Sequence, residues 1–338
     1  MIGGGFAGLQ VAKSLRRAPV YVVVVDRQNH HLFQPLLYQV ATAGLAAPDI
    51  AAPIRRILRH QDNASVLYAE VTAIATARRV VPLGARALAR KILPDDFRNF
   101  DPKQTEGLLV EGGPRVLAAD SEDLSASAQR QLERLGVTVR TGAQVTGIDA
   151  EGVTVAGGER IPARTVLWAA GVQVSPLLGG LGAPTDRAGR GAVEPDLSVP
   201  GHPDVYVIGD AAQVPWKDGL VPGVAPAALQ MGKHAAKQIQ RRLRGEATTA
   251  FRYLDKGSMA TIGRASAVAE IGGRHLRGLL AWLAWLFVHL LFLVGFRSRL
   301  VVLINWIWAY VGYRPVARVL AALADEDGPR AARTSEPT

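Results

Sequence analysis

The sequence predicts an α/β protein of two α/β domains with a C-terminal appendage, and three observations indicate it. Residues 3–8 read GGGFAG and precede a short helical pattern, which is followed by the apolar run 20–25, typical of a buried parallel strand. Strand and helix patterns then alternate along the chain, and 338 residues are enough for two such domains. A segment rich in Leu, Trp and Phe begins at Gly278 and forms the appendage.

The glycine loop has the spacing that binds the pyrophosphate of a dinucleotide. Gly3 would make a tight turn, Gly5 would let backbone amides approach the phosphates, and Gly8 would let the next helix pack closely on its strand. The positive N-terminus of that helix would then face the negative charge.

The helix and strand after the loop support this interpretation. Leu9, Ala12 and Leu15 fall on one helical face, and the strand that follows ends in Asp26. An acidic residue about 20 residues after the loop is the acceptor that a ribose diol requires. We therefore favour a dinucleotide site over a glycine-rich turn beside an unrelated carboxylate.

The composition limits the possible partners. The net charge of +10 and the pI of about 10.2 indicate an anionic partner. Basic residues are scattered, and no zinc spacing, RNP-like strand or helix-turn-helix pattern accompanies them, so we expect an anionic membrane surface and no nucleic acid. There is no cysteine, which excludes disulfides, thiolate metal sites and redox-active thiol pairs. No secretory signal precedes the loop, and we expect the body of the protein in the cytoplasm.

Residues 29–44 combine polar and aromatic side chains with a helix-breaking Pro35. His30 and His31 lie here without a carboxylate or third ligand at metal spacing, so we expect loop or capping histidines and no metal site. Further patterns predict strands at 65–74 and 75–81, a basic helix at 82–103, a buried strand at 108–111, a helix at 124–135 ended by Gly136, a strand at 137–139 and a β-meander at 144–163.

Two more predicted strands end in small residues. The strand pattern of residues 165–171 ends in Ala-Ala-Gly, and that of residues 205–210 ends in Gly-Asp. Open α/β sheets bind ligands at the carboxyl ends of their strands. A helix begins directly afterwards at Ala225, and its N-terminal dipole would stabilise an anionic reduced ring.

With these residues in view, the chain resembles the type II NADH dehydrogenases, which are single-subunit, non-proton-pumping NADH:quinone oxidoreductases of the respiratory chain. The resemblance covers nearly the whole chain. It rests on GGGFAG with Asp26 and on the segments HHLFQPLLYQVATAG, LVEGGPRVL, WAAGV, DVYVIGDAA, APAALQMG and DKGSMATIGR. It implies two interleaved Rossmann-like domains followed by membrane-associating helices. The missing cysteines separate the chain from the related disulfide reductases and sulfide:quinone reductases.

The resemblance also implies the domain boundaries and the cofactors. Residues 1–81 and 172–275 would bind FAD, residues 82–171 would bind NADH, residues 276–318 would anchor the protein to the membrane, and residues 319–338 would be a disordered tail. The implied FAD contacts are Gly3, Gly5, Phe6, Ala7, Gly8, Asp26, Arg27, Gly209, Asp210 and Ala227. Within this set, Asp26 would bind the adenosine ribose, Asp210 the ribityl or phosphate region, and Ala227 would lie near the isoalloxazine.

The NADH and quinone contacts follow from the same resemblance. Glu111 would accept a hydrogen bond from the NADH ribose and disfavour a 2′-phosphate, while Ala170 and Gly171 would lie under the nicotinamide nucleotide. Gln230 and Lys256 would border the quinone. No catalytic side chain is expected, because FAD carries the hydride and the electrons.

The chain departs from this family pattern at one place. Members carry a second GxGxxG loop about 25 to 30 residues before the acid that matches Glu111, yet Gly84 is the only glycine from Val81 to Glu106. We interpret this as an internal deletion, with a shortened N-terminus in which only Ile2 remains of the first strand. We predict weak or absent NADH binding, and the alternative function is a non-catalytic, membrane-attached remnant. An FAD-dependent reductase of a soluble carrier is disfavoured by the apolar tail.

The apolar tail consists of the uncharged run 278–296 and a second stretch at 300–313. It contains four of the six tryptophans, Trp282, Trp285, Trp306 and Trp308, as expected for rings at a headgroup boundary. We favour a pair of interfacial helices, with a transmembrane span and a buried core helix as alternatives. The protein would lie on the cytoplasmic face of the inner membrane, peripheral or monotopic, and a homodimer is a further expectation.

Overall fold

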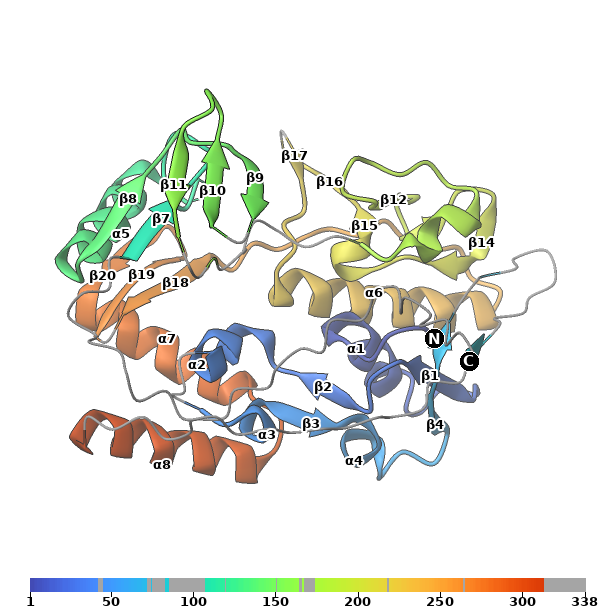
Figure 1. Ribbon diagram of the computed structural model, residues 1–338. Helices are drawn as coiled ribbons and strands as arrows, with labels where there is room; N and C mark the ends of the chain where they lie inside the picture. The colour runs from blue at the N-terminus through green and yellow to red at the C-terminus, as the bar shows by residue number, and fades with distance from the viewer. Residues whose placement is uncertain are drawn as a thin grey trace, which may run out of the picture.

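The computed structural model describes residues 1–41, 45–71, 74, 83–84, 107–118, 120–149, 151–163, 166, 174–217, 219–263 and 265–312. Figure 1 shows the N-terminal elements, which include α1 (Phe6–Ser14) and β1 (Val22–Asp26), below two separate units at the upper left and upper right. The helices α7 (Gly278–Phe292) and α8 (Phe296–Gly312) lie at the lower left. The helix α6 (Ala225–Leu243) lies beside α1 and joins the upper right unit to the N-terminal elements.

The N-terminal unit begins with the expected helix and strand. Its elements are α1 (Phe6–Ser14), β1 (Val22–Asp26), β2 (His30–Leu32), the 3-10 helix η1 (Gln34–Leu36), α2 (Leu37–Ala41), α3 (Ala47–Ile50), β3 (Ala51–Pro53), α4 (Ile54–Leu58), β4 (Ala64–Tyr68) and β5 (Glu70–Val71). β1 and β4 pair in parallel, and the predicted face Leu9, Ala12 and Leu15 is buried against them and against α6. The first α/β unit is thus confirmed at the level of its helix, strand and core.

The predicted strand at 65–74 is interrupted. β4 ends at Tyr68, and β5 follows after one residue and pairs antiparallel with β6 (Leu83–Gly84). Of the helix predicted at 82–103, only residues 83 and 84 are described, and they form a strand because they hydrogen-bond to β5. The predicted strand at 75–81 lies outside the described residues.

The second unit, green in Figure 1, matches its predicted elements closely. They are β7 (Gly107–Val110), α5 (Glu122–Arg134), β8 (Val137–Arg140), β9 (Val145–Asp149), β10 (Gly152–Val155) and β11 (Arg160–Pro162). β7 and β8 pair in parallel, and β9, β10 and β11 form the expected antiparallel meander. The predicted burial of the strand at 108–111 is wrong: Leu108 and Leu109 are 40% and 38% exposed, because β7 pairs only with β8 in the described part of the chain.

The third unit is made of short strands around α6. Its elements are the 3-10 helix η4 (Pro176–Leu181), β12 (Gly191–Ala192), β13 (Ser198–Val199), β14 (His202–Tyr206), the 3-10 helix η5 (Gly209–Ala211), β15 (Ala212–Gln213), β16 (Pro215–Trp216), β17 (Gly219–Leu220) and α6 (Ala225–Leu243). α6 begins at the predicted residue. The strand predicted over 205–210 ends early, because the chain turns into η5 at Gly209, where φ is +71°. The strand predicted at 165–168 falls outside the described residues except for Val166, which is not in a strand.

The C-terminal unit carries the two apolar helices. β18 (Ser258–Gly263), β19 (Ser266–Ile271) and β20 (Arg274–Arg277) form an antiparallel sheet, and α7 (Gly278–Phe292) and α8 (Phe296–Gly312) follow it. Within the residues described, neither of these helices nor any other reaches the length and hydropathy that crossing a membrane requires.

Two of the four tail tryptophans do not lie where the sequence placed them. Trp285 and Trp306 are only 3% and 5% exposed, because they pack with Phe33, Leu36 and other residues of the N-terminal unit in one apolar cluster. The expectation of a headgroup position is therefore wrong for these two rings.

Candidate functional site

The glycine loop has the geometry that a pyrophosphate site requires. Gly3 has a φ of +89°, which a side chain would strain, and it makes the tight turn. A Cβ on Gly8 would lie 2.1 Å from the carbonyl oxygen of Gly3, so the close approach of α1 requires glycine there. At Gly5, by contrast, a Cβ would have no heavy atom of the described residues within 4 Å apart from its chain neighbours, which leaves that side of the loop open.

Asp26 is tied directly to this loop. Its Oδ2 accepts a hydrogen bond from the Gly4 amide at 2.6 Å, and its Oδ1 accepts one from the Gln28 amide at 2.7 Å. The carboxylate thus stands at the end of β1 and at the edge of the phosphate cradle, which is the position of a ribose acceptor. Arg27 follows it and is exposed.

The second wall of the site comes from η5 and the start of α6. A Cβ on Gly209 would lie 3.3 Å from the Cβ of the buried Ala7, so η5 approaches the first turn of α1. Asp210 is exposed and faces Gly223, and Ala227 is buried in the first turn of α6. The structure therefore brings the predicted FAD residues of three separate segments into one place.

The residues predicted to bind NADH are only partly described. Oε1 of Glu111 accepts a hydrogen bond from the Gly113 amide at 2.8 Å, which fixes the carboxylate at the end of β7. The nearby guanidinium of Arg115 donates to the carbonyl oxygens of Ala118 and Asp120 at 2.9 and 2.7 Å, so it is engaged within its own turn. Ala170 and Gly171 lie outside the described residues.

The two residues predicted to border the quinone are linked through the segment that follows α6, residues 254–256. Both groups of the Gln230 amide bond to the backbone of Leu254, each at 2.9 Å. Lys256 lies two residues further on and is exposed. Gln230 therefore holds the segment that carries Lys256, a pairing that the sequence did not indicate.

The sequence also missed His31. We expected a loop histidine, but His31 is the central residue of β2, is only 4% exposed, and has its Nδ1 at 3.1 Å from the Gly4 carbonyl oxygen. Burial lowers its pKa, although the hydrogen bond to Gly4 acts in the opposite direction. The one available sequence signal is its position five residues after Asp26 in the chain.

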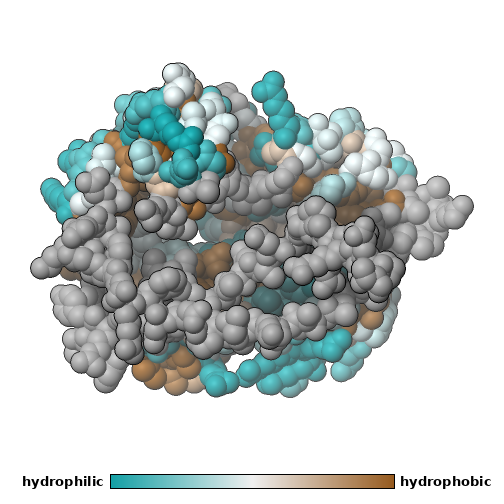
Figure 2. All heavy atoms as spheres, viewed as in Figure 1, coloured by the Kyte–Doolittle hydropathy of each residue, from teal (hydrophilic) through white to brown (hydrophobic). Residues whose placement is uncertain are grey.

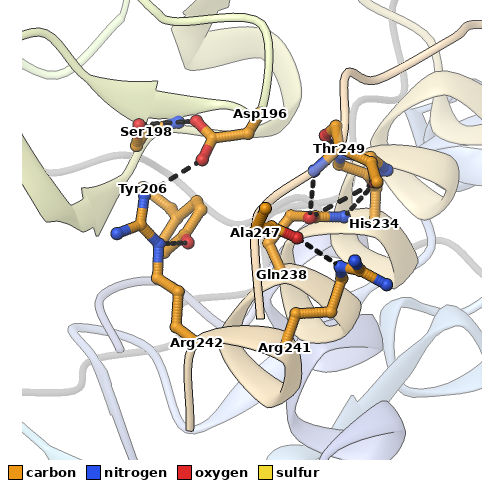
Figure 3. A network of polar contacts seen from close by, with 9 residues as sticks. All are labelled: Asp196, Ser198, Tyr206, His234, Gln238, Arg241, Arg242, Ala247 and Thr249. Carbon is orange, nitrogen blue, oxygen red and sulfur yellow. Dashed lines mark hydrogen bonds and ion pairs between the residues drawn. The ribbon is translucent and has the colours of Figure 1, made fainter. Parts of the chain in front are cut away.

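A cleft lies elsewhere among the described residues, at the C-terminal end of α6. It has a volume of about 460 Å³ and is lined by Glu194, Asp196, Ser198 and Arg242 among others. Figure 3 shows that Arg242 points between Asp196 and Tyr206, while Gln238 and Thr249 pair beside it. These groups satisfy one another and fasten α6 to β13 and β14, so we interpret the network as structural.

The described residues contain no group of three histidine or acidic side chains that could hold a metal ion. Comparison with known proteins bears directly on the dinucleotide cradle. Residues 1–93 and 97–232 match the family model described as pyridine nucleotide-disulphide oxidoreductase, and residues 256–314 match the NDH2 C-terminal domain.

The chain is 35% identical to the type II NADH:quinone oxidoreductase NdhA of Mycobacterium tuberculosis, over 92% of this chain and 87% of that protein. The chain belongs to the type II NADH:quinone oxidoreductase family. It is similarly 34% identical to the second enzyme of this type from that organism, Ndh, over 93% of this chain and 88% of that protein. The activity of the family is electron transfer from NADH to quinone, and its fold carries FAD and NADH.

The solved structures agree on the fold. The structure of NDH2 from Plasmodium falciparum in complex with NADH superposes with a TM-score of 0.77 over 94% of this chain and 99% of that chain, at 14% identity. The alignment with NdhA is 411 residues long, whereas this chain has 338. Relatives of the type II NADH:quinone oxidoreductase family therefore contain residues for which this chain has no counterpart.

Proposed function

We propose that this chain binds FAD in the cradle formed by the glycine loop, Asp26, η5 and the start of α6, and reduces a membrane quinone there. The observation that carries the proposal is the convergence of these segments. Gly8 allows the backbone of Gly3 to approach α1, Gly209 allows η5 to approach α1, and a Cβ on Gly5 would face open space. The chemistry of the cradle fits FAD, because it offers backbone amides for a pyrophosphate and a carboxylate for a ribose.

Each part of the cradle has a physical task. The amides of Gly5 and of the first turn of α1 have no partner within the helix, and among the described residues no side chain caps them, so they are available to phosphate oxygens. The first turn of α6, which contains Ala227, is the positive end of the helix dipole and would stabilise negative charge placed beside it. FAD, when bound, accepts a hydride from NADH and returns electrons to quinone. Side-chain nucleophiles are not required.

The surface of α7 and α8 supports attachment to a membrane. Large apolar side chains are exposed on both helices; among the described residues they are Leu279, Leu280, Leu283, Phe287, Leu291 and Phe292 on α7 and Phe296, Leu300, Ile304 and Ile307 on α8. Figure 2 shows one group of apolar residues at the left part of the lower edge, on the side where α8 lies in Figure 1, with hydrophilic residues along the rest of the visible edge. Together with the net charge of +10, this favours an anionic lipid surface. The protein would attach to the cytoplasmic face of the inner membrane. A homodimer stays a prediction.

One experiment tests the main proposal. The protein is purified in detergent, its flavin is quantified, and NADH and then a short-chain quinone are added without oxygen. We expect a yellow protein whose reduced flavin is reoxidised by quinone. A colourless protein that does not take up added FAD would refute the proposal. Flotation with vesicles of anionic or neutral lipid measures membrane binding separately. Equal binding to both kinds of vesicle would show that the positive charge of the protein does not contribute to that binding.

A specific observation bears on the reaction of this chain with NADH. Gly84 is the only glycine between Val81 and Glu106, where relatives of this family would carry the NADH glycine loop, and the long alignment with NdhA requires missing residues. We therefore propose that NADH reduces the flavin of this chain slowly. Reduction by dithionite instead of NADH separates the two half-reactions: quinone should reoxidise the dithionite-reduced flavin rapidly. Fast bleaching by micromolar NADH would contradict the proposal.

A further inference from the structure

His31 holds the glycine loop through a hydrogen bond whose direction is fixed. The Nδ1 atom lies 3.1 Å from the carbonyl oxygen of Gly4. Because a carbonyl oxygen can only accept, Nδ1 carries the proton and donates. The ring is also held by Phe6, whose ring meets it edge-on, with centroids 4.8 Å apart and an interplanar angle of 88°.

Gly4 is consequently bound at both of its polar groups. Its amide donates to Asp26 at 2.6 Å, and its carbonyl accepts from His31. A Cβ at this position would lie 2.4 Å from Cδ1 of Ile54, so Gly4 fits closely between its neighbours. Two side chains from different strands, β1 and β2, therefore determine how this one residue is oriented.

The carbonyl of Gly4 and the amide of Gly5 belong to one planar peptide group, and in a trans peptide they point in opposite directions. The hydrogen bond to His31 thus directs the Gly5 N–H away from the ring. A peptide between two glycines can rotate at low steric cost, because neither residue has a Cβ. Without a partner for the carbonyl, the Gly4–Gly5 peptide could rotate, and the direction of the Gly5 amide would no longer be fixed.

We propose that His31 is a positioning residue for FAD, which holds the Gly4–Gly5 peptide so that the Gly5 amide faces the pyrophosphate. The inference rests on the proposed function, since it assumes that FAD binds at this loop. It assigns to the HHLF segment a task at the cofactor, in addition to its packing role through Phe33.

A pair of amide variants tests the position of the donor. The Nδ2 of an asparagine lies near the place of Nδ1 of histidine, whereas the amide nitrogen of a glutamine lies further out. We expect His31→Asn to bind FAD nearly as the wild type does, and His31→Gln and His31→Phe to bind it about 10-fold more weakly, as loss of a buried hydrogen bond implies. The dissociation constant is measured by titrating deflavinated protein with FAD, whose fluorescence reports binding.

The chain offers a matched control at His234. Its Nε2 lies 3.0 Å from the carbonyl oxygen of Thr249, and Phe251 contacts its ring edge-on, so the hydrogen bond and ring contact of His234, which is on α6, do not involve the glycine loop. His234→Phe should lower thermal stability without changing FAD affinity. The ³¹P spectrum of bound FAD adds a readout that general destabilisation does not move: we expect the pyrophosphate signals to shift in His31→Gln and not in His31→Asn or His234→Phe.

The outcomes separate this inference from the proposed function. If wild-type protein binds no FAD, the proposed function fails. If the wild type binds FAD but His31→Gln and His31→Asn bind it equally well, with unchanged ³¹P signals, the inference is overturned. A loss of affinity in His234→Phe as large as that in His31→Phe would also overturn it, because the effect would then follow from destabilisation. If His31→Phe does not fold, the comparison of His31→Asn with His31→Gln still tests the inference.

Discussion

The carboxylate of Asp26 accepts a hydrogen bond from the backbone amide of Gly4 at 2.6 Å, and this contact joins the end of β1 to the glycine loop. The same carboxylate also accepts a hydrogen bond from the backbone amide of Gln28. Asp26 therefore shapes the loop as well as the ribose end of the proposed FAD site, and both tasks depend on acceptor oxygens.

The first prediction concerns this carboxylate. Asp26→Ala removes the acceptor for Gly4 and for a ribose diol, and we expect FAD affinity to fall by at least about 10-fold, the equivalent of one charged hydrogen bond. Equilibrium titration of deflavinated protein measures it. Arg27→Ala, at the exposed neighbouring position, serves as the comparison, and we expect a smaller loss there. Full retention of FAD by Asp26→Ala would show that the adenosine lies elsewhere.

The second prediction concerns the close approach of α1. Gly8→Ala places a methyl group 2.1 Å from the Gly3 carbonyl oxygen, so the loop must move. We expect purified Gly8→Ala protein to contain little or no flavin. Gly219→Ala is the matched control, because no other heavy atom of the described residues lies within 4 Å of a Cβ at that position. If both variants retain flavin equally, the loop does not carry the cofactor.

These two predictions concern parts of the structure that local sequence patterns predict. Periodic apolar residues predicted α1 and α5, and turn residues predicted the meander of β9 to β11. Glycine spacing and an acidic strand end predicted the cradle, because each residue there performs a task of the backbone or of a carboxylate. The domain boundaries stay predictions.

What the sequence could not provide were contacts between distant segments. Burial of Trp285 depends on Phe33 and Leu36, so an apolar helix alone does not reveal which of its faces meets protein. The pairing of Gln230 with the backbone of Leu254 follows no periodicity, and the same holds for the contact of His31 with Gly4. Such contacts are set by the path of the chain in three dimensions.

The third prediction separates the two faces of α7. Trp285 is 3% exposed and packs against Trp306, whereas Phe287 is 62% exposed. We expect Trp285→Ala to lower the free energy of unfolding by about 3–5 kcal/mol, as for other buried aromatic residues. Phe287→Ser should change it by less than about 0.5 kcal/mol but reduce binding to anionic vesicles. Denaturant unfolding and vesicle flotation measure the two effects, and unchanged flotation of Phe287→Ser would contradict the proposed lipid face.

The fourth prediction concerns the acid sensitivity of Asp196, which joins β13 to α6. Burial would raise the pKa of this carboxyl group, but the hydrogen bonds from Ser198, Thr248 and the guanidinium of Arg242 together outweigh burial and lower the pKa below its ordinary value. A carboxyl group with a lowered pKa in the folded state stabilises the protein above its unfolded pKa of about 3.9, and this contribution is lost as the pH falls through the folded value.

We therefore expect Asp196→Asn to lower the free energy of unfolding by about 1–3 kcal/mol at pH 7, since Arg242 loses its charged partner. Between about pH 5 and pH 3, the stability of the wild type should fall more steeply than that of the variant, because only the wild type takes up a proton at this site. Urea unfolding at a series of pH values measures both curves, with Asp62→Asn, an exposed position, as the control. Parallel curves for wild type and Asp196→Asn would mean that the carboxyl group has the same pKa in the folded and unfolded states, and that Arg242 and Ser198 do not stabilise its charge.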